Sequence, residues 1–296
     1  MRVVREVREL QQLADGQRAA GRRIALVPTM GALHAGHLAL VAEARRRADL
    51  VVVSIFVNPS QFGPGEDFAA YPRPFEADAE RCREAGADVV FAPDGAALYP
   101  PGAQTFVEVE KLSRPLCGAV RPGHFRGVAT VVAKLLLAAK PHVAVFGAKD
   151  FQQVAVVRRL VRDLCFDTEI VSVPTAREAD GLALSSRNVF LDGATRPQAL
   201  CLARALEAAE GAAQAGERRV EALLALVRRE IAKSPLAELD YAELRDPESL
   251  EPAPARLAAP TLLALAVRFP AASGSRSVRL IDNTVLLDPA PREELS

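Results

Sequence analysis

The sequence lacks a net charge, since its 296 residues include 37 lysines and arginines and 37 aspartates and glutamates. Proteins that bind nucleic acid or anionic membranes without sequence specificity usually carry an excess of positive charge, so this balance argues against both kinds of partner. Half of the residues are hydrophobic, which excludes a disordered or fibrous chain. A chain of this length buries roughly 75% of its unfolded surface in one large or two ordinary domains. We therefore expect a globular protein that binds a small ligand.

Closely spaced cysteines are also missing. The four cysteines lie dozens of residues apart, with no CxxC pair and no CxH cluster, at Cys82, Cys117, Cys165 and Cys201. This spacing indicates neither a zinc knuckle nor a disulfide framework. Because a free cysteine usually packs as a small hydrophobic side chain, we expect four buried thiols without a chemical role.

Long hydrophobic runs are absent as well. The first ten residues, MRVVREVREL, mix charge into every turn and lack the apolar core and cleavage site of a signal peptide. The most apolar stretch, residues 128–148, is interrupted by Lys134, Lys140, Pro141 and His142. A membrane-spanning helix needs about 20 apolar residues without such interruptions. We expect a soluble, cytoplasmic protein.

Helix and strand patterns alternate through residues 1–175. A first helix is predicted from the helical spacing of Val3, Val7, Leu10 and Ala14. Further helices are predicted at 37–47, 75–85, 128–139 and 151–164, and strands at 24–27, 51–57, 88–91, 143–146 and 169–173. Short apolar strands separated by helices are typical of a parallel sheet covered on both faces. Residues 1–175 are therefore predicted to form a doubly wound, Rossmann-like α/β domain.

The pattern changes after residue 176. Two helical stretches rich in alanine, leucine and arginine are predicted at 196–215 and 218–233, followed by strands at 241–244, 261–269 and 277–287. The proline-rich residues 251–260 connect two of these strands. Residues 176–296 are predicted to form a smaller α+β domain that acts as a lid.

The most informative segment follows the strand predicted at residues 24–27. It reads Pro28-Thr29-Met30-Gly31-Ala32-Leu33-His34-Ala35-Gly36-His37 and leads into a helix. In an open α/β sheet, ligands bind at the carboxyl ends of the strands, where the N-terminus of a helix attracts phosphate. His34 and His37 share one face of the first helical turn, and Gly31 and Gly36 allow a nucleotide to approach the backbone. This pattern predicts two imidazoles in contact with a phosphoryl group.

Two other interpretations of the histidine pair are open. In the first, one or both rings only satisfy hydrogen bonds or cap the helix. The placement of two of the four histidines within four residues at a strand-to-helix junction favours function instead. In the second, the pair binds zinc, but HxxH without an intervening glutamate lacks the metalloprotease pattern, and no third ligand lies nearby.

The segment resembles the HxGH signature of the nucleotidylyltransferases, a superfamily that activates substrates by attack on the α-phosphate of a nucleoside triphosphate. Further motifs follow in order, namely FVNPSQF at 56–62, ED at 66–67, YPR at 71–73, GAVRPGHFRG at 118–127, FGAKDFQQ at 146–153 and EADGLALSSRN at 178–188. Together they resemble the pantoate–β-alanine ligase family. The resemblance implies that pantoate and β-alanine are condensed to pantothenate, AMP and pyrophosphate through pantoyl adenylate, with ATP and Mg²⁺, in a homodimer.

The resemblance assigns three segments to ATP. The implied contacts are Pro28, Thr29, Met30, Gly31, His34, Gly36 and His37, then Gly147, Lys149 and Asp150, then Ala176, Leu184, Ser185, Ser186 and Arg187. The implied catalytic residues are His37, which donates at the α-phosphate, together with His34, Lys149 and Arg187. The residues alone leave two alternatives open: a solvated turn at 149–150 and an ordinary polar loop at 184–187.

The resemblance implies that residues 1–175 bind the nucleotide and pantoate, and it assigns individual residues to pantoate and β-alanine. Gln61 and Gln153 match the pantoate contacts, Gln61 also lies where β-alanine would arrive, and Asn58, Tyr71 and Arg121 match positions near the site. Neutral amides orient a nucleophilic carboxylate without the tight ion pair that an arginine would form. The roles of Arg121, His124 and Arg126 stay open, and the last two are equally consistent with surface residues. No protein ligand to a metal is assigned.

Three other functions are alternatives to this one. Another HxGH adenylyltransferase would transfer AMP to a phosphate ester, but the glutamine pair and the LSSRN motif argue against it. A non-catalytic nucleotide-binding module is possible because one fold hosts many functions, but retention of His34, His37, Lys149 and Arg187 argues against a decayed site. A fragment of an aminoacyl-tRNA synthetase would need a basic surface for tRNA, which the zero net charge does not favour.

Overall fold

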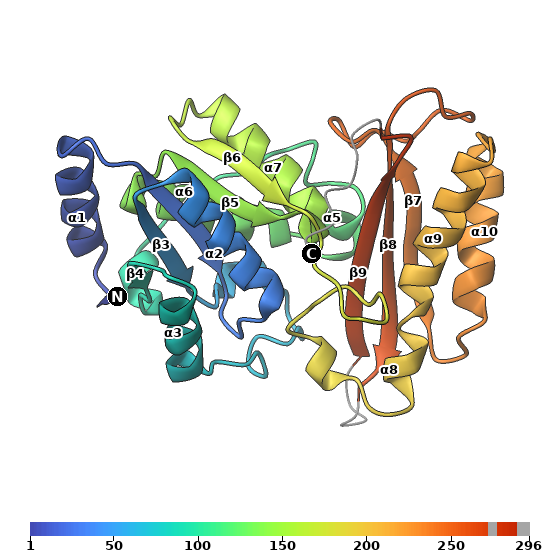
Figure 1. Ribbon diagram of the computed structural model, residues 1–296, viewed down its shortest axis with the longest axis horizontal. Coiled ribbons are helices and arrows are strands. Elements are labelled where there is room, and N and C mark those ends of the chain that lie inside the picture. The colour runs from blue at the N-terminus through green and yellow to red at the C-terminus, as the bar shows by residue number, and fades with distance from the viewer. Residues whose placement is uncertain (272–276, 289–296) are drawn as a thin grey trace. The chain divides into compact units, whose positions relative to one another are not determined.

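The computed structural model describes residues 1–271 and 277–288, and the chain divides into two compact units (Figure 1). The first unit comprises Met1–Ala148 and Gln152–Val173, and the second comprises Lys149–Phe151 and Pro174–Ser296. Among the described residues, no helix is long and apolar enough to cross a membrane. The functions assigned above to residues 1–175 and 176–296 stay predictions.

The first unit is built on a parallel sheet of six strands. Their bounds are β1 (Arg2–Val4), β2 (Ile24–Thr29), β3 (Leu50–Ile55), β4 (Val89–Phe91), β5 (Val143–Gly147) and β6 (Glu169–Val173). The order across the sheet is β1-β4-β3-β2-β5-β6, and every pairing is parallel. The four residues at the start of β2, Ile24 to Val27, are completely buried, as expected for a central strand covered on both faces. The predicted Rossmann-like sheet is confirmed.

Helices connect these strands. They are α1 (Val7–Ala19), α2 (Ala35–Arg47), α3 (Phe75–Glu84), α4 (Gly95–Leu98), α5 (Cys117–Val120), α6 (His124–Ala139) and α7 (Phe151–Asp163), with short 3₁₀ helices η1 (Pro59–Gln61) and η2 (Ala148–Asp150). Leu40 and Val41 of α2 and Cys82 of α3 pack in one hydrophobic cluster with Val27 and Val53 of the sheet. This cluster fixes α2, and therefore its N-terminus, against the end of β2.

The strand order reverses at β2. The chain runs from β2 to β3 and β4 on one side of the sheet and returns to β5 on the other side of β2. Open α/β sheets bind ligands at the carboxyl ends of the two strands that flank such a reversal. The HxGH segment follows β2 directly, and Gly147 ends β5. Two of the sequence motifs therefore begin at the topological switch point.

The second unit packs helices on an antiparallel sheet. Its elements are η3 (Asn188–Phe190), α8 (Thr195–Gln198), α9 (Cys201–Gln214), α10 (Val220–Ala232), β7 (Glu238–Arg245), β8 (Thr261–Pro270) and β9 (Ser277–Leu286). The strands lie in the order β7-β8-β9. Leu202 of α9 and Leu223 of α10 share one buried cluster with Leu263, Leu265 and Phe269 of β8. The predicted α+β architecture is confirmed.

Several predicted boundaries differ from the structure. Val3 lies in β1 and not in the first helix, because a strand of three residues is too short to show its own periodicity. β3 ends at Ile55, two residues before the predicted end. α2 begins at Ala35 and α6 at His124, two and four residues before the predicted starts. The predicted helix at 196–215 is divided into α8 and α9.

Candidate active site

The two histidines of the HxGH segment lie at the start of α2. His34 is the N-cap residue, and its Nδ1 accepts a hydrogen bond from the backbone N–H of Gly36 at 3.2 Å. The Nδ1 of His37 accepts from the backbone N–H of His34, also at 3.2 Å, and the ring centroids are 4.1 Å apart. Because each Nδ1 is an acceptor, each neutral ring carries its proton on Nε2. His34 does cap the helix, and the capping bonds fix the tautomer of both rings.

Helix α3 holds the loop that precedes these histidines. The backbone N–H groups of Ala32 and Leu33 donate to the two carboxylate oxygens of Asp78 at 2.7 and 2.8 Å, and Arg81 donates to the carbonyl of Leu33. Asp78 is only 1% exposed. Gly31 has φ +84°, and a Cβ at this position would lie 2.9 Å from Asp78 Oδ2. Gly31 therefore supplies both a left-handed backbone and the space for this carboxylate.

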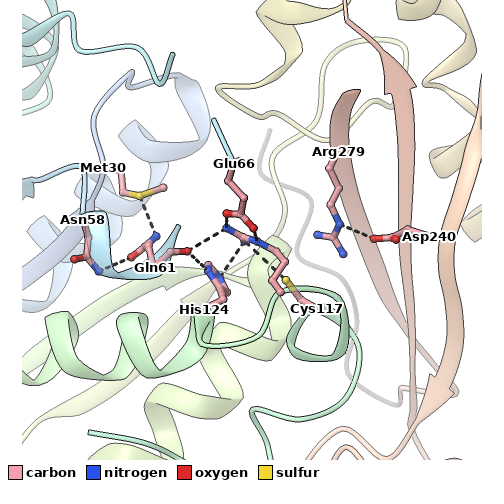
Figure 2. Close-up of polar contacts among 9 residues, drawn as sticks. Met30, Asn58, Gln61, Glu66, Cys117, His124, Asp240 and Arg279 are labelled. Atoms are coloured by element: carbon pink, nitrogen blue, oxygen red, sulfur yellow. Dashed lines mark hydrogen bonds and ion pairs between the residues drawn. The ribbon is translucent and has the colours of Figure 1, made fainter. Parts of the chain in front are cut away.

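Gln61 lies in η1, just beyond the end of β3, and is buried. Its side-chain Nε2 donates to the sulfur of Met30 at 3.0 Å, and its Oε1 accepts from Asn58 Nδ2 at 3.0 Å (Figure 2). The same amide nitrogen of Asn58 donates to the carbonyl of Gly127 at 3.2 Å. The structure thus brings Met30 of the HxGH segment into one contact network with Asn58 and Gln61 of the FVNPSQF motif.

Arg121 and His124 contact the main chain of Gln61. The guanidinium of Arg121 forms a bidentate ion pair with Glu66, with N···O distances of 2.8 and 2.6 Å. It also donates to the carbonyl of Gln61 at 3.2 Å, and His124 Nδ1 lies 2.7 Å from the same oxygen. Arg126, in contrast, is exposed and stacks its guanidinium over Phe106 at 4.1 Å.

The ion pair between Glu66 and Arg121 makes stability depend on pH. Burial raises the pKa of Glu66, but the hydrogen bond and charge of Arg121 outweigh it and hold the carboxyl pKa below its usual range. A carboxyl whose pKa is lowered by folding stabilises the protein above its unfolded pKa, and this contribution disappears as the pH falls through the folded pKa.

We therefore expect Glu66→Gln to be less stable than the parent protein at pH 7, with a difference that shrinks as the pH falls below about 4. Urea denaturation at pH 7, 5 and 3.5 measures this difference. Glu110→Gln is the matched control, because Glu110 pairs with Arg114 while both side chains are exposed, and such pairs contribute little. A Glu66→Gln difference that stays constant with pH would contradict the assignment.

The segment after β5 contains two glutamines with different environments. Gln152 is buried, and its amide donates to the carbonyls of Leu112 and Pro115 and accepts from the N–H of Cys117. Gln153 is half-buried. Gln152 is therefore a structural residue that fixes the loop before α5, whereas Gln153 stays the candidate pantoate ligand.

In the second unit, the LSSR residues follow a tight hairpin. Arg177 and Ala183 form an antiparallel bridge, and the N–H of Leu184 donates to the carbonyl of Ala176 at 2.9 Å. The hydroxyl of Ser185 then accepts from the N–H of Arg187 at 3.2 Å. Ala176 and Leu184, which the resemblance assigns to one ATP segment, are thus adjacent, and Ser185 and Arg187 extend from the base of the hairpin.

An ion pair fastens this hairpin to β9. Arg177 donates to both carboxylate oxygens of Asp282 at 2.7 and 3.0 Å, and Asp282 is buried. The next residue of β9, Asn283, donates its side-chain amide to the carbonyl of Lys149 at 2.7 Å within the same unit. Strand β9 therefore supports both the hairpin and the backbone of Lys149, a connection that the sequence motifs did not indicate.

None of the four cysteines, all of which lie in the described part of the chain, forms a disulfide. Cys82, Cys117 and Cys201 are buried, and burial is the main cause that raises the pKa of Cys82 and of Cys201 to about 11. These two side chains are therefore protonated thiols at neutral pH and poor nucleophiles. The expectation of a buried thiol is wrong for Cys165, which is exposed in the turn after α7 with φ +55°.

Comparison with known proteins identifies the family of this chain. A family model described as "Pantoate-beta-alanine ligase" matches residues 2–285. The chain belongs to the pantoate–β-alanine ligase family. The pantothenate synthetase of Geobacter sulfurreducens is 54% identical over 286 residues, which cover 97% of this chain and 99% of the relative. That of Myxococcus xanthus is 52% identical over 289 residues, or 96% of each chain. The predicted family and enzyme class are confirmed.

Solved structures of family members have the same fold. Pantothenate synthetase from Thermus thermophilus superposes with a TM-score of 0.88 at 49% identity, covering 96% of this chain and 99% of that one. Pantoate-β-alanine ligase from Francisella tularensis, in complex with β-γ ATP and β-alanine, has a TM-score of 0.77 at 32% identity, covering 96% and 97%. The fold of both units is therefore that of the family.

Proposed function

We propose that this protein condenses pantoate with β-alanine, using ATP, in two displacement steps. A carboxylate oxygen of pantoate attacks the α-phosphorus, and pyrophosphate leaves to give pantoyl adenylate. The amine of β-alanine then attacks the acyl carbon, and AMP leaves with the formation of pantothenate. The family membership and the complex of the Francisella relative with β-γ ATP and β-alanine support these substrates. Neither step uses an enzyme nucleophile, which agrees with the protonated thiols of Cys82 and Cys201.

The two adjacent Nε2–H donors of His34 and His37 carry this proposal. They lie in the first turn of α2, where the helix N-terminus adds backbone N–H groups and a partial positive charge. As the carboxylate attacks, negative charge grows on the α-phosphate oxygens and on the departing pyrophosphate. Donors that are already held by backbone hydrogen bonds stabilise this charge without reorganising. His37 is proposed to donate at the α-phosphate, with His34 beside it on the phosphate chain.

Other residues of each unit are proposed to contact ATP. In the first unit they are Pro28, Thr29, Met30, Gly31, Gly36 and Gly147, and in the second unit Lys149, Asp150, Ala176, Leu184, Ser185, Ser186 and Arg187. Lys149 and Arg187 would neutralise phosphate charge, and Asp150 would accept hydrogen bonds from the ribose hydroxyls. Two hydrogen bonds support this assignment, one from the N–H of Leu184 to the carbonyl of Ala176 and one from the N–H of Arg187 to the hydroxyl of Ser185. Together they fix the start of the Ser185–Arg187 segment.

Pantoate is proposed to bind the side chains of Gln61 and Gln153, with Asn58 and Tyr71 nearby. The side-chain amide of Gln61 is already oriented by Asn58 and Met30, so it presents a fixed donor and acceptor to the substrate. Neutral amides hold the carboxylate without pairing it to a cation, and the attacking oxygen keeps its nucleophilicity.

Mg²⁺ is proposed to reach the site on the triphosphate. Within residues 1–271 and 277–288, no group of three or more His, Cys, Asp or Glu side chains is placed to hold a metal ion. Mg²⁺ typically keeps several waters and binds through substrate phosphates, so it does not require a dedicated cluster of protein ligands. Bound in this way, it would neutralise charge on the triphosphate. The homodimer and the cytoplasmic location stay predictions from the sequence.

Pyrophosphate exchange into ATP tests the first step. With Mg²⁺ and pantoate present and β-alanine absent, labelled pyrophosphate should enter ATP, and omission of pantoate should abolish the incorporation. Exchange that does not depend on pantoate would point to another adenylyl acceptor. ATP binding without any exchange would support a regulatory nucleotide-binding module.

A further inference from the structure

We propose that Glu66, Arg121 and His124 form a clamp on the main-chain carbonyl of Gln61 and thereby position its side chain for pantoate. The three are positioning residues, because in the structure they act on Gln61 and on one another. This inference rests on the pantoate-binding role proposed for Gln61 and explains three side chains whose roles are not defined by any pattern in the sequence.

The carbonyl of Gln61 receives two donors from outside its own segment. His124 Nδ1 lies 2.7 Å from the oxygen and Arg121 Nη2 lies 3.2 Å from it. Figure 2 shows His124 reaching this carbonyl from the helix below η1. Helix η1 has only three residues, and its own backbone bond from Gln61 to Asn58 is long at 3.4 Å. The two external donors therefore contribute substantially to fixing the backbone of Gln61.

Arg121 is held in place by its ion pair. Its Nε and Nη2 engage both oxygens of Glu66, and its Nη1 approaches His124 Nε2 at 3.2 Å. The side chains of Arg121 and Glu66 are 15% and 26% exposed. The Nε/Nη2 edge of the guanidinium is bound to the Glu66 carboxylate, and the Nη1/Nη2 edge contacts His124 and the carbonyl of Gln61, so both edges that could grip a second carboxylate are engaged. Arg121 is thus better arranged to orient Gln61 than to bind a substrate carboxylate.

The hydrogen bonds also define which ring nitrogen of His124 carries the proton. A carbonyl can only accept, so His124 Nδ1 carries a proton, and Arg121 can only donate, so His124 Nε2 is an acceptor. His34, His37 and His142 are the opposite, because each accepts a backbone N–H on Nδ1. His124 is therefore the one Nδ1–H tautomer among the four histidines, and the polar chain runs in one direction from Arg121 through His124 to Gln61.

The side chain of Gln61 is fixed at its other end. Asn58 and Met30 contact the amide, while the clamp holds the carbonyl. A change in the clamp would rotate the backbone of Gln61 and move the amide away from these partners. The expected consequence is weaker pantoate binding with little effect on ATP, because the HxGH loop is held separately by Asp78.

Two substitutions of His124 test the clamp. In His124→Asn the amide nitrogen takes the place of Nδ1–H, whereas His124→Ala removes the donor. In pantoate-dependent exchange we expect the alanine variant to raise the pantoate KM about tenfold, as for the loss of one strong hydrogen bond. The ATP KM should change less than about twofold, and the asparagine variant should stay within about threefold of the parent. Arg114→Ala is the control, since Arg114 is exposed.

Two kinetic results would overturn the clamp. Equal increases in the ATP and pantoate KM would show a general loss of structure, and an effect confined to the β-alanine KM of the full reaction would show direct contact with β-alanine. If the parent protein shows no pantoate-dependent exchange, the proposed function fails instead. The clamp is then still testable by ¹⁵N NMR of histidine-labelled protein, which should show one Nδ1–H and three Nε2–H tautomers near pH 8. An Nε2–H tautomer for His124 would refute it.

Discussion

Replacing His37 with alanine is expected to lower kcat for pantoate-dependent pyrophosphate exchange roughly 10²- to 10⁴-fold. The reason is geometric, because the Nδ1 of His37 is held by the backbone N–H of His34 and its Nε2–H is the donor presented beside the helix N-terminus. A donor that meets charge only in the transition state affects kcat more than KM. A rise in the ATP KM with unchanged kcat would contradict this role.

Two further variants distinguish the roles of the two ring nitrogens of His37. In His37→Gln the amide nitrogen lies near Nε2, so part of the donor function should remain. In His37→Asn the amide lies near Nδ1, where the structure has an acceptor for His34 N–H. We expect the glutamine variant to retain more exchange activity than the asparagine variant, with both unfolding at similar temperatures. The reverse order would show that the catalytic contact is made at Nδ1 and not at Nε2, and would contradict the proposed role.

Gly127→Ala is expected to destabilise the protein strongly. A Cβ at Gly127 in α6 would lie 2.2 Å from the carbonyl oxygen of Ser60 and 2.6 Å from the backbone nitrogen of Gln61. Because both are main-chain atoms, either α6 or η1 must shift. Overpacking of this kind destabilises proteins by about 1–3 kcal/mol, and we expect a value at or above the upper end. The shift of η1 should also raise the pantoate KM.

The chain contains two matched controls for this substitution. Gly16 in α1 and Gly211 in α9 are also helical, but a Cβ at either position would meet nothing within 4 Å. Alanine there should stabilise the protein by roughly 0.5–1 kcal/mol, since glycine loses more conformational freedom on folding. Urea denaturation of the three variants measures these differences. Similar stability changes in all three would show that the contact between α6 and η1 is unimportant.

The features predicted from sequence were those with local patterns. Apolar strands between helices indicated the parallel sheet because both faces of such strands are buried. The histidine pair was visible because residues three apart share a helix face, and the structure places His34 and His37 in the first turn of α2. No local pattern predicts the Arg177–Ala183 hairpin, although residues 178–183 belong to the EADGLALSSRN motif.

The missed features depend on long-range contacts. Asp78 lies 45 residues from Leu33, and Glu66 lies 55 residues from Arg121. The only local signal for Asp78 is a carboxylate beside Ala79 on the buried side of α3. Glu66 belonged to a family motif, but no pattern in the sequence connects it to Arg121. Side-chain hydrogen bonds to a distant backbone leave no periodicity, so these residues could be found only in the folded structure.

Transfer of ¹⁸O from the carboxylate of pantoate tests pantoyl adenylate formation most directly. If a carboxylate oxygen attacks the α-phosphorus, complete turnover with β-alanine should place one ¹⁸O atom in each AMP and leave the other in the amide carbonyl of pantothenate. Pyrophosphate should contain no label. Mass spectrometry of AMP, pyrophosphate and pantothenate measures all three. Label in pyrophosphate or in orthophosphate, with unlabelled AMP, would show attack at another phosphorus and contradict the adenylate intermediate.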